Sequence, residues 1–421
     1  MNADLIIKNI RTLYTPFHHP PIHGMKMNEI QTFNEAFIAI KDGKFIGFGE
    51  GPYDKFLSQG TQIYDALHCI VIPGLIDSHT HLVHGGSREA EFSKKIAGVP
   101  YIDILLQGGG IFSTVESTRN ATFKELYDKA MNSLKEMLLF GVTTIEAKSG
   151  YGLNQMTEVL QLEVAKKCDN DQPITIISTY LGAHALPKEF KGAREVYINQ
   201  VLSDMKTIKD KDLAKFVDVF CEKDVFTLEE TSKILNKAIS LGFKVRLHSD
   251  EMVSIGGTKL ALDLKANSID HLMAITDQDI DLLASSKTIG NLLPSTSFFL
   301  NKEYAPARKM IEKGCAVSIS SDYNPGSAPS ENFQFTMQLA GNKLKMTPSE
   351  ILTASTINPA YGLGLSDHVG SIQIGKQADF SILKASNLDY VIYHYGVNHT
   401  QDVFKNGKLV VRDKTIVKGD K

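Results

Sequence analysis

The chain has 421 residues, of which 43% are hydrophobic and 22% are charged, as is usual for a globular protein. Its 45 basic and 48 acidic residues give a net charge of -3, so no basic excess favours nucleic acid or an anionic membrane as a partner. The absence of a long apolar run or a signal-like N-terminus, and four scattered cysteines, lead us to expect a cytoplasmic protein with free thiols.

Both ends of the chain have the pattern of short β strands. The runs "ADLIIKNIRTLYT" and "AFIAIKDGKFIGFG" lie before residue 70, and "GSIQIGKQADFSIL" and "DVFKNGKLVVRD" lie near the C-terminus. Asp42-Gly43 and Asn406-Gly407 are typical of the tight turns of β hairpins. We therefore predict antiparallel hairpins at both ends.

Between the two ends, strands and helices alternate. Apolar, β-branched runs lie near residues 70–77, 142–147, 174–180, 216–221, 243–248, 266–271, 288–293 and 315–321. Amphipathic segments fit between most of them; "TLEETSKILNKAISLG" begins with a capping-box pattern at Thr227 and Glu230. Eight successive strand–helix units predict an α/β fold, a (β/α)8 TIM-like barrel. A doubly wound sheet is the alternative.

Polar and titratable side chains follow the carboxyl ends of these eight runs. In chain order they are His79 and His81, Lys148 and Tyr151, His184, Glu222, His248 with Asp250 and Glu251, His271, Ser295 with Thr296, and Asp322 with Asn324. Barrel enzymes build their active sites at the carboxyl ends of their strands. The sequence therefore predicts a catalytic site at this end of the barrel.

The pair His79 and His81 suggests a metal. Residues two apart on a strand face the same way, so the two imidazoles can converge on one point. Imidazole is the commonest protein ligand for transition metals. Together with His248, His271 and Asp322 at other strand ends, the pair predicts a site for zinc or iron.

These residues carry a resemblance to a known family. "PGLIDSHTHL" resembles the metal-binding opening of the amidohydrolase superfamily. The motifs "HTHLVHGGSREAEF", "GGGIFSTVESTR", "EAKSGYGL", "GAHALP", "HSDE", "SSDYNPGSAPSEN" and "YHYGVNH", spread over residues 77–399, together resemble the imidazolonepropionase family within it. The resemblance implies a metal-dependent hydrolase barrel over residues 71–368. It also implies a small β-sandwich domain formed by residues 1–70 plus 369–421.

The resemblance further implies a reaction in histidine degradation. Water activated by a metal would hydrolyse the cyclic amide C–N bond of 4-imidazolone-5-propanoate to N-formimino-L-glutamate. Its metal ligands would be His79, His81, His248 and Asp322. Glu251 is similar to the proton-shuttling glutamate of ring aminohydrolases, and His271 would lie beside the metal or its water. Asp322 could also accept the proton of the water, and the sequence leaves this choice open.

The substrate would be a small anion with a propionate tail. We expect Arg88 to bind that tail, because a guanidinium forms a two-pronged contact with a carboxylate. By resemblance, Tyr151, His184 and Glu251 would also contact the substrate, and Asn324, Gly326 and Ser327 would hold its ring or the formimino end of the product. A homodimer is a further expectation from the family.

One departure from the superfamily pattern bears on the metal count. Many members bridge two metals with a carboxylated lysine at the end of strand four, whereas here that strand ends in Cys221-Glu222-Lys223. Lys148 ends strand two instead. We therefore expect one metal, zinc or iron, with the roles of Lys148 and Glu222 open. The glycine-rich stretches 108–110 and 150–152 do not match a phosphate-binding loop, so no nucleotide cofactor is expected.

Two other functions remain open at this point. A guanine- or cytosine-type deaminase would share the histidines, the glutamate and the aspartate, but its substrate lacks the anionic tail that Arg88 would bind. A non-catalytic relative could keep the barrel as a binding scaffold, although such a protein need not retain the metal ligands. Metal analysis separates these two classes.

Overall fold

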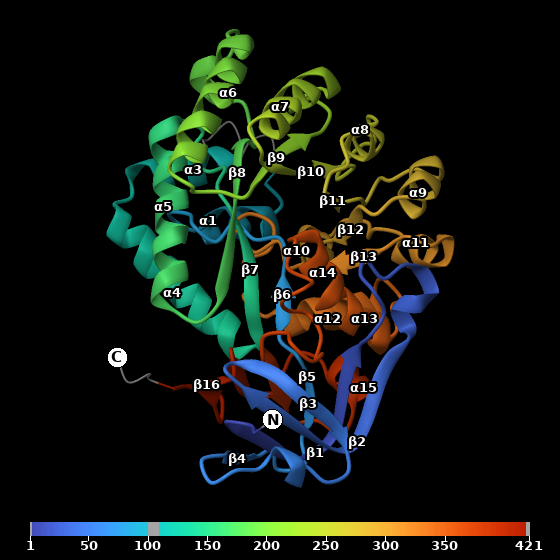
Figure 1. The fold of residues 1–421 in the computed structure, drawn as a ribbon. Helices are drawn as coiled ribbons and strands as arrows, with labels where there is room; N and C mark the ends of the chain where they lie inside the picture. Colours follow the sequence, from blue (N-terminus) through green and yellow to red (C-terminus); the bar gives the residue numbers. More distant parts are fainter. Residues whose placement is uncertain (1, 100–108, 418–421) are drawn as a thin grey trace.

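The structure, a computed structural model, describes residues 2–99 and 109–417. Gly108, the first residue of one of the glycine-rich stretches, lies outside the described residues. Figure 1 shows two parts: a barrel surrounded by helices, and a smaller β sheet that contains the first and the last strands of the described residues. Within the described residues no helix is long and apolar enough to cross a membrane.

The barrel is built from eight parallel strands in the order in which they occur along the chain. They are β6 (Leu75–Asp77), β7 (Val142–Lys148), β8 (Thr175–Ala183), β9 (Phe216–Cys221), β10 (Lys244–Ser249), β11 (Ser268–His271), β12 (Ile289–Leu292) and β13 (Val317–Ile319). A parallel bridge between Thr80 and Tyr323 joins the segments that follow β6 and β13. The predicted TIM-like barrel is thereby confirmed.

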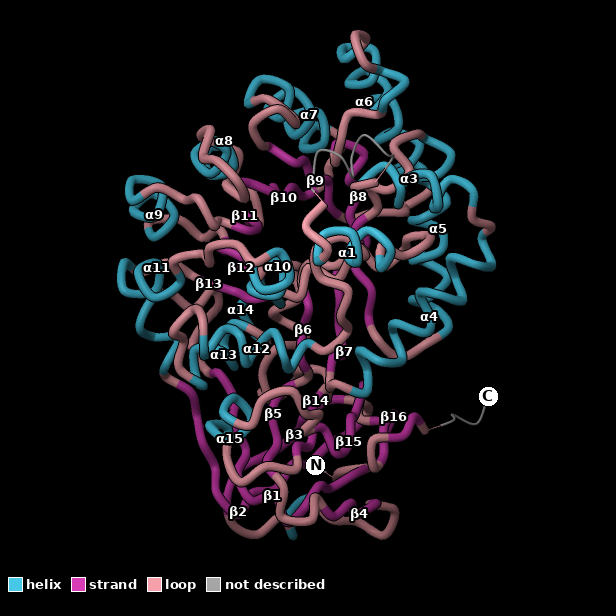
Figure 2. Tube along the Cα trace, turned by 180° about the vertical axis from the view of Figure 1, so that it is seen from behind, coloured by secondary structure: helices cyan, strands magenta, loops and turns pink. Residues whose placement is uncertain are grey.

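Helices surround the barrel, as Figures 1 and 2 show. They are α1 (Glu89–Ile96), α3 (Ile111–Asn120), α4 (Phe123–Leu139), α5 (Gln155–Asp171), α6 (Arg194–Asp210), α7 (Leu228–Ser240), α8 (Gly257–Asp263), α9 (Asp277–Ala284), α10 (Pro294–Leu300), α11 (Ala307–Lys313), α12 (Phe333–Asn342), α13 (Pro348–Ala354) and α14 (Ile357–Gly362). The capping box predicted at Thr227 is present: its hydroxyl accepts from the backbone of Glu230, whose side chain accepts from the backbone of Thr227.

The segment expected as a single strand over residues 70–77 forms two strands in two different sheets. β5 (Ile70–Pro73) pairs with the small sheet, whereas β6 pairs with β7 in the barrel. The change of sheet occurs at Gly74, where an added Cβ atom would lie 2.3 Å from Oγ1 of Thr143. The close packing at this glycine therefore lets one continuous run of chain serve both sheets.

The small sheet has nine strands among the described residues, in the order β17-β16-β15-β14-β5-β1-β2-β3, with β4 paired to β1. The remaining bounds are β1 (Leu5–Pro16), β2 (Ile30–Lys41), β3 (Lys44–Glu50), β4 (Gln62–Asp65), β14 (Phe380–Leu383), β15 (Thr400–Lys405), β16 (Lys408–Arg412) and β17 (Thr415–Ile416), with α15 (Leu388–Tyr393) between β14 and β15. The expected β-sandwich takes the form of one sheet that curls over its own core, bringing the rings of Phe45 and Phe380 within 6.1 Å.

Candidate active site

Three buried histidines converge at the carboxyl end of the barrel strands. One ring nitrogen from each of His79, His81 and His248 lies within 4.8 Å of the others. Nε2 of His79 and Nε2 of His248 have no hydrogen-bond partner among the described residues. Buried polar atoms are normally paired, so unpaired imidazole nitrogens in a group of three histidines suit the binding of a transition metal.

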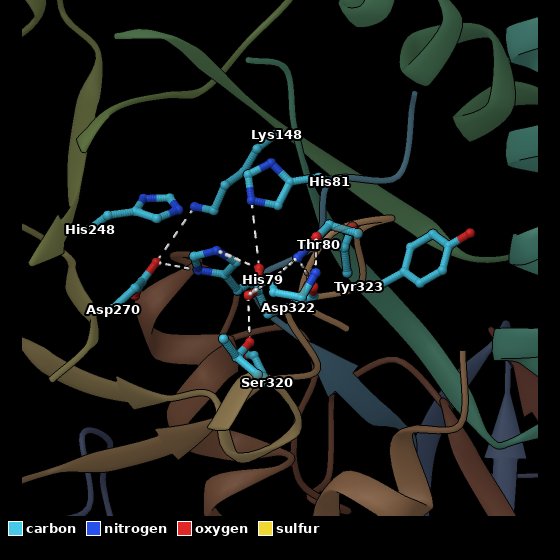
Figure 3. Close-up of polar contacts among 12 residues, drawn as sticks. His79, Thr80, His81, Lys148, His248, Asp270, Ser320, Asp322 and Tyr323 are labelled. Atoms are coloured by element: carbon cyan, nitrogen blue, oxygen red, sulfur yellow. Dashed lines mark hydrogen bonds and ion pairs between the residues drawn. The ribbon is translucent and has the colours of Figure 1, made fainter. Parts of the chain in front are cut away.

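Asp322 completes this group of side chains, as Figure 3 shows. Its Oδ1 atom lies 3.5 Å from Nε2 of His79 and 3.6 Å from Nε2 of His81. Its Oδ2 atom accepts hydrogen bonds from Thr296 and Ser327, at 2.5 and 3.2 Å. One carboxylate oxygen therefore faces the histidines while the other is held by hydroxyl groups.

Carboxylates contact Nδ1 of two of the histidines and so orient their rings. Nδ1 of His79 lies 2.8 Å from Oδ2 of Asp270, and Nδ1 of His248 lies 2.9 Å from Oδ2 of Asp218. A carboxylate at one ring nitrogen fixes the proton there and leaves the other nitrogen free to bind a metal. Both histidines are therefore held in place through Nδ1, while Nε2 of each has no hydrogen-bond partner among the described residues.

A buried ion network holds these carboxylates in turn. The Lys148 ammonium lies 2.7 Å from Asp218, 2.9 Å from Glu146 and 3.5 Å from Asp270, and Arg246 lies 3.2 Å from Asp270; all five side chains are fully buried. Burial lowers the pKa of Lys148, but Asp218 and Glu146 outweigh this effect, and the net shift is upward. Lys148 is thus a buried cation between three carboxylates.

Glu251 and His271 lie together beside the histidine cluster. Oε2 of Glu251 is 3.6 Å from Nε2 of His271. Burial raises the pKa of Glu251 to about 7, with His248 lowering it and Glu222 raising it. Burial also lowers the pKa of His271 to about 4. Glu251 can therefore both accept and release a proton near neutral pH, while His271 remains uncharged.

Three residues of the site leave their strands with unusual backbone geometry. Asp250, His271 and Asp322 have φ angles of 55°, 81° and 57°, in the left-handed region that non-glycine residues rarely adopt. Such conformations cost of order 1–3 kcal/mol each and are retained where the surrounding structure requires them. The sharp turns place His271 beside Glu251 and Asp322 beside His79, whereas the Asp250 carboxylate accepts a hydrogen bond from Thr258.

Arg88 lies at the start of α1 and is already paired with a carboxylate. Its Nε and Nη2 atoms donate to Glu91 at 3.0 and 2.5 Å. A guanidinium has five N–H donors, so the edge formed by Nη1 and Nη2 still offers two for a second carboxylate. An added Cβ atom at Gly326 would lie 2.1 Å from Nη1 of Arg88. Only a glycine at 326 therefore leaves this guanidinium in place.

Asn324 lies with Gly326 in the loop that follows β13. The polar atoms of its side chain all form hydrogen bonds within this loop. Its Nδ2 atom donates to the carbonyl of Asp322 and to Ser327, and its Oδ1 atom accepts from the backbone of Gly326 and Ser327. A contact between Asn324 and a substrate therefore has to replace one of these hydrogen bonds.

A cavity of about 390 Å³ is lined by Arg88, Asn324 and Gly326, together with the rings of Phe92 and Phe299.

Tyr151 and His184 lie next to the histidine cluster. The rings of His81 and His184 stack at 5.0 Å, and that of Tyr151 lies 5.4 Å from His81. Burial and then Asp322 raise the pKa of the Tyr151 hydroxyl, while Arg88 lowers it. Tyr151 is therefore within electrostatic reach of both the cluster and Arg88.

The loop that carries Tyr151 is held by a buried glutamate that our sequence reasoning missed. The Glu158 carboxylate accepts hydrogen bonds from the backbone N–H groups of Gly150, Gly152 and Leu153, at 2.9, 2.8 and 2.8 Å. Its sequence position, on the apolar face of a helix, was a signal that could have identified it.

The ion network was also missed, although its residues carried a signal. Charged side chains are almost never fully buried unless they are paired. Glu146, Asp218, Arg246 and Asp270 each interrupt an apolar strand run. Glu146 and Arg246 also precede Lys148 and His248 by two residues, which places each pair on one face of its strand.

Solved structures share the fold at low sequence identity. An adenosine deaminase from Xanthomonas campestris with bound zinc aligns with a TM-score of 0.74 at 17% identity, over 100% of this chain and 95% of that one. The atrazine chlorohydrolase from Arthrobacter aurescens, complexed with zinc, aligns with a TM-score of 0.73 at 16% identity, over 99% and 97% of the two chains. These similarities establish the fold.

A family model matches part of the chain, and relatives of higher sequence identity match nearly all of it. The family model described as "Amidohydrolase family" matches residues 264–421. An imidazolonepropionase from Fusobacterium nucleatum is 50% identical over 98% of this chain and 100% of its own length. One from Streptococcus gordonii is 49% identical over 99% of this chain and 100% of its own. The chain belongs to the imidazolonepropionase family of the amidohydrolase superfamily.

Proposed function

We propose that the protein hydrolyses the cyclic amide C–N bond of 4-imidazolone-5-propanoate to N-formimino-L-glutamate, a reaction of histidine degradation. Full-length relatives named for this activity support the proposal. The observation that carries it is the combination of a histidine cluster that could hold a metal, a glutamate whose pKa is about 7, and an arginine whose outer edge has no hydrogen-bond partner among the described residues. A deaminase shares the first two features, whereas a guanidinium with a free edge suits the carboxylate of a propionate tail.

The proposed chemistry uses the residues of the cluster in defined ways. A metal held by His79, His81, His248 and Asp322 would lower the pKa of water toward about 7 and so supply a nucleophile at neutral pH. Water oxygen bonds to the ring carbonyl carbon, the bond from this carbon to the ring nitrogen breaks, and the nitrogen takes up a proton. Glu251 accepts the proton that water gives up and delivers it to the leaving nitrogen. His271, being uncharged, can donate a hydrogen bond to the carbonyl oxygen.

The direct test uses purified protein of known metal content. We expect imidazolone propionate to disappear as formiminoglutamate forms, with no ammonia released in the same step. Guanine and cytosine, offered under the same conditions, should remain intact. Deamination of either base together with an inert imidazolone propionate would contradict the proposal and favour the deaminase alternative.

A single metal is expected at the histidine cluster. Elemental analysis should find about one zinc or iron ion per chain, and a zinc-loaded crystal should show ligand distances of about 2.0–2.2 Å for the histidine nitrogens. His79→Ala should lose most of this metal, whereas His399→Ala, at a buried histidine directly before β15, should retain it. Two bridged ions in a fully loaded crystal would contradict the expectation.

Arg88→Ala should lower kcat/KM by at least about tenfold. A charge-assisted hydrogen bond contributes roughly 1.5–3 kcal/mol, and each 1.4 kcal/mol corresponds to a factor of about ten. Arg88→Lys should recover only part of the loss, because an ammonium lacks the two-pronged edge. The change should lie mostly in KM if the tail is bound equally in the ground and transition states. Steady-state kinetics at matched metal content measure it; an unchanged kcat/KM would place the carboxylate anchor elsewhere.

We also propose that the protein is a cytoplasmic homodimer and that its metal is zinc or iron. Zinc in two solved structures of the same fold supports the first of these metals. The four cysteines are buried free thiols, a state that suits a reducing compartment. Sedimentation or scattering measurements of the purified protein test the dimer.

A further inference from the structure

The loop after β10 contains Glu251 and is attached to the barrel at two points. On its N-terminal side, the carbonyl of Asp250 accepts from the backbone of Ala274 at 2.7 Å, and the Asp250 carboxylate accepts from Thr258 at 2.5 Å. On its C-terminal side, the backbone N–H groups of Met252 and Val253 turn inward. Glu251 lies between the two attachments.

The second attachment is made by one side chain from another strand. Glu222, directly after β9, is 1% exposed. Its Oε2 atom accepts from the backbone of Met252 at 2.9 Å, and its Oε1 atom accepts from Val253 at 3.1 Å and from Lys223 at 3.0 Å. The side chains of Met252 and Val253 are 60% and 46% exposed, so they add little burial to hold the loop.

We propose that Glu222 is a positioning residue: its buried carboxylate binds the backbone on the C-terminal side of Glu251 and thereby holds this glutamate against the site. The inference rests on the proposed proton-carrying role of Glu251. A carboxylate suits this position because its two oxygens can accept from two neighbouring N–H groups at once. An amide in the same place has only one accepting oxygen and would turn its NH₂ group toward an N–H donor.

The charge of Glu222 also acts on Glu251. The groups that face Glu251 electrostatically are His248 on β10, His271 on β11, Asp322 after β13 and Glu222 after β9. Of these, Glu222 raises the pKa of Glu251. Removing its negative charge should therefore lower that pKa. The acidic limb of the activity profile, which reports ionisation of Glu251, should then move to lower pH.

The experiment compares Glu222→Gln with Glu222→Asp and with Glu350→Gln. Glu350 is a fully buried carboxylate outside the site that accepts from the backbone of Thr347 and pairs with Arg308. Glu222→Gln should lower kcat by roughly 10-fold to 100-fold, as expected for a misplaced catalytic group, and shift the acidic limb of kcat down by about half a pH unit or more. Glu350→Gln should lower stability but leave the acidic limb unchanged.

Two further readouts separate positioning from general damage. Hydrogen exchange of the amides of Met252 and Val253 should be at least about tenfold faster in Glu222→Gln than in the wild type, because one amide loses its acceptor. Glu222→Asp keeps the charge on a shorter side chain, so its acidic limb should stay near the wild-type position while kcat falls. It also allows the test to proceed if Glu222→Gln does not fold.

Unchanged amide exchange together with unchanged kcat and acidic limb in Glu222→Gln would overturn the inference. Equal effects in Glu222→Gln and Glu350→Gln would overturn it too, because they would reflect stability alone. The proposed role of Glu251 is tested separately by Glu251→Gln. If that variant retains turnover, the proposed role of Glu251 fails. If it loses turnover while Glu222→Gln is normal, only the positioning inference fails.

Discussion

Glu251→Gln should lower turnover by about 10²–10⁴ while leaving the metal content of the protein unchanged. Glutamine keeps the shape of the side chain but cannot carry a proton. Glu251 lies 3.6 Å from His271 and has a pKa of about 7, so in the wild type kcat should rise with pH as this group ionises. The variant should lose that acidic limb, because the group that titrates is gone.

Glu163→Gln is a suitable control for this experiment. Glu163 pairs with Lys211 on the surface, and its substitution should leave both turnover and the pH profile unchanged. Steady-state kinetics from about pH 5 to 9, with metal content measured for each sample, give the comparison. Near-normal turnover in Glu251→Gln would assign the proton transfer to Asp322, the other carboxylate of the site.

Lys148→Met should lower the free energy of unfolding of the metal-free protein by about 3–5 kcal/mol, as is typical when one partner of a buried ion pair is removed. Three fully buried carboxylates surround the network formed by Lys148 and Arg246. Without the ammonium, one cation remains among three anions. A metal cation bound at the adjacent histidines offsets part of that excess negative charge, so the loss should be smaller in the metal-loaded protein.

Lys405→Met provides a matched comparison for Lys148→Met. Lys405 forms a buried pair with Asp379 at 2.6 Å, in the small sheet. Its removal should also destabilise the protein, but by the same amount with and without metal. Denaturant unfolding of both variants, in chelator and in excess metal, measures these differences. A loss in Lys148→Met that does not depend on metal would show that the network is electrostatically independent of the metal site.

The parts of the fold and the site that depend on local patterns could be predicted from the sequence. The eight barrel strands follow from apolar, β-branched runs, and the shared face of His79 and His81 follows from the two-residue period of a strand. The two hairpin turns follow from Asp42-Gly43 and Asn406-Gly407, which join β2 to β3 and β15 to β16. In each case the residues involved lie within a few positions of one another.

The features that could not be predicted depend on closure of the barrel. Lys148 on β7 and Asp218 on β9 are 70 residues apart, and Glu222 after β9 and Met252 after β10 are 30 apart. Their contacts exist only because the closed barrel brings these strands together. The division of residues 70–77 between two sheets has the same origin, since β5 is paired by a strand from the far end of the chain. A single sequence contains no signal of which distant charges will meet.

The position of β5 has a consequence for synthesis of the chain on the ribosome. In the small sheet β5 lies between β1 and β14, and β14 follows it by roughly 300 residues. At about 5–20 residues per second, one edge of β5 stays unpaired for roughly 15–60 s while the barrel is made. Exposed strand edges recruit other chains, so nascent chains on crowded ribosomes carry an aggregation-prone edge throughout this interval. β5, which precedes β6 and the histidine pair, thus receives its second neighbour only after all eight barrel strands have been made (Figure 1).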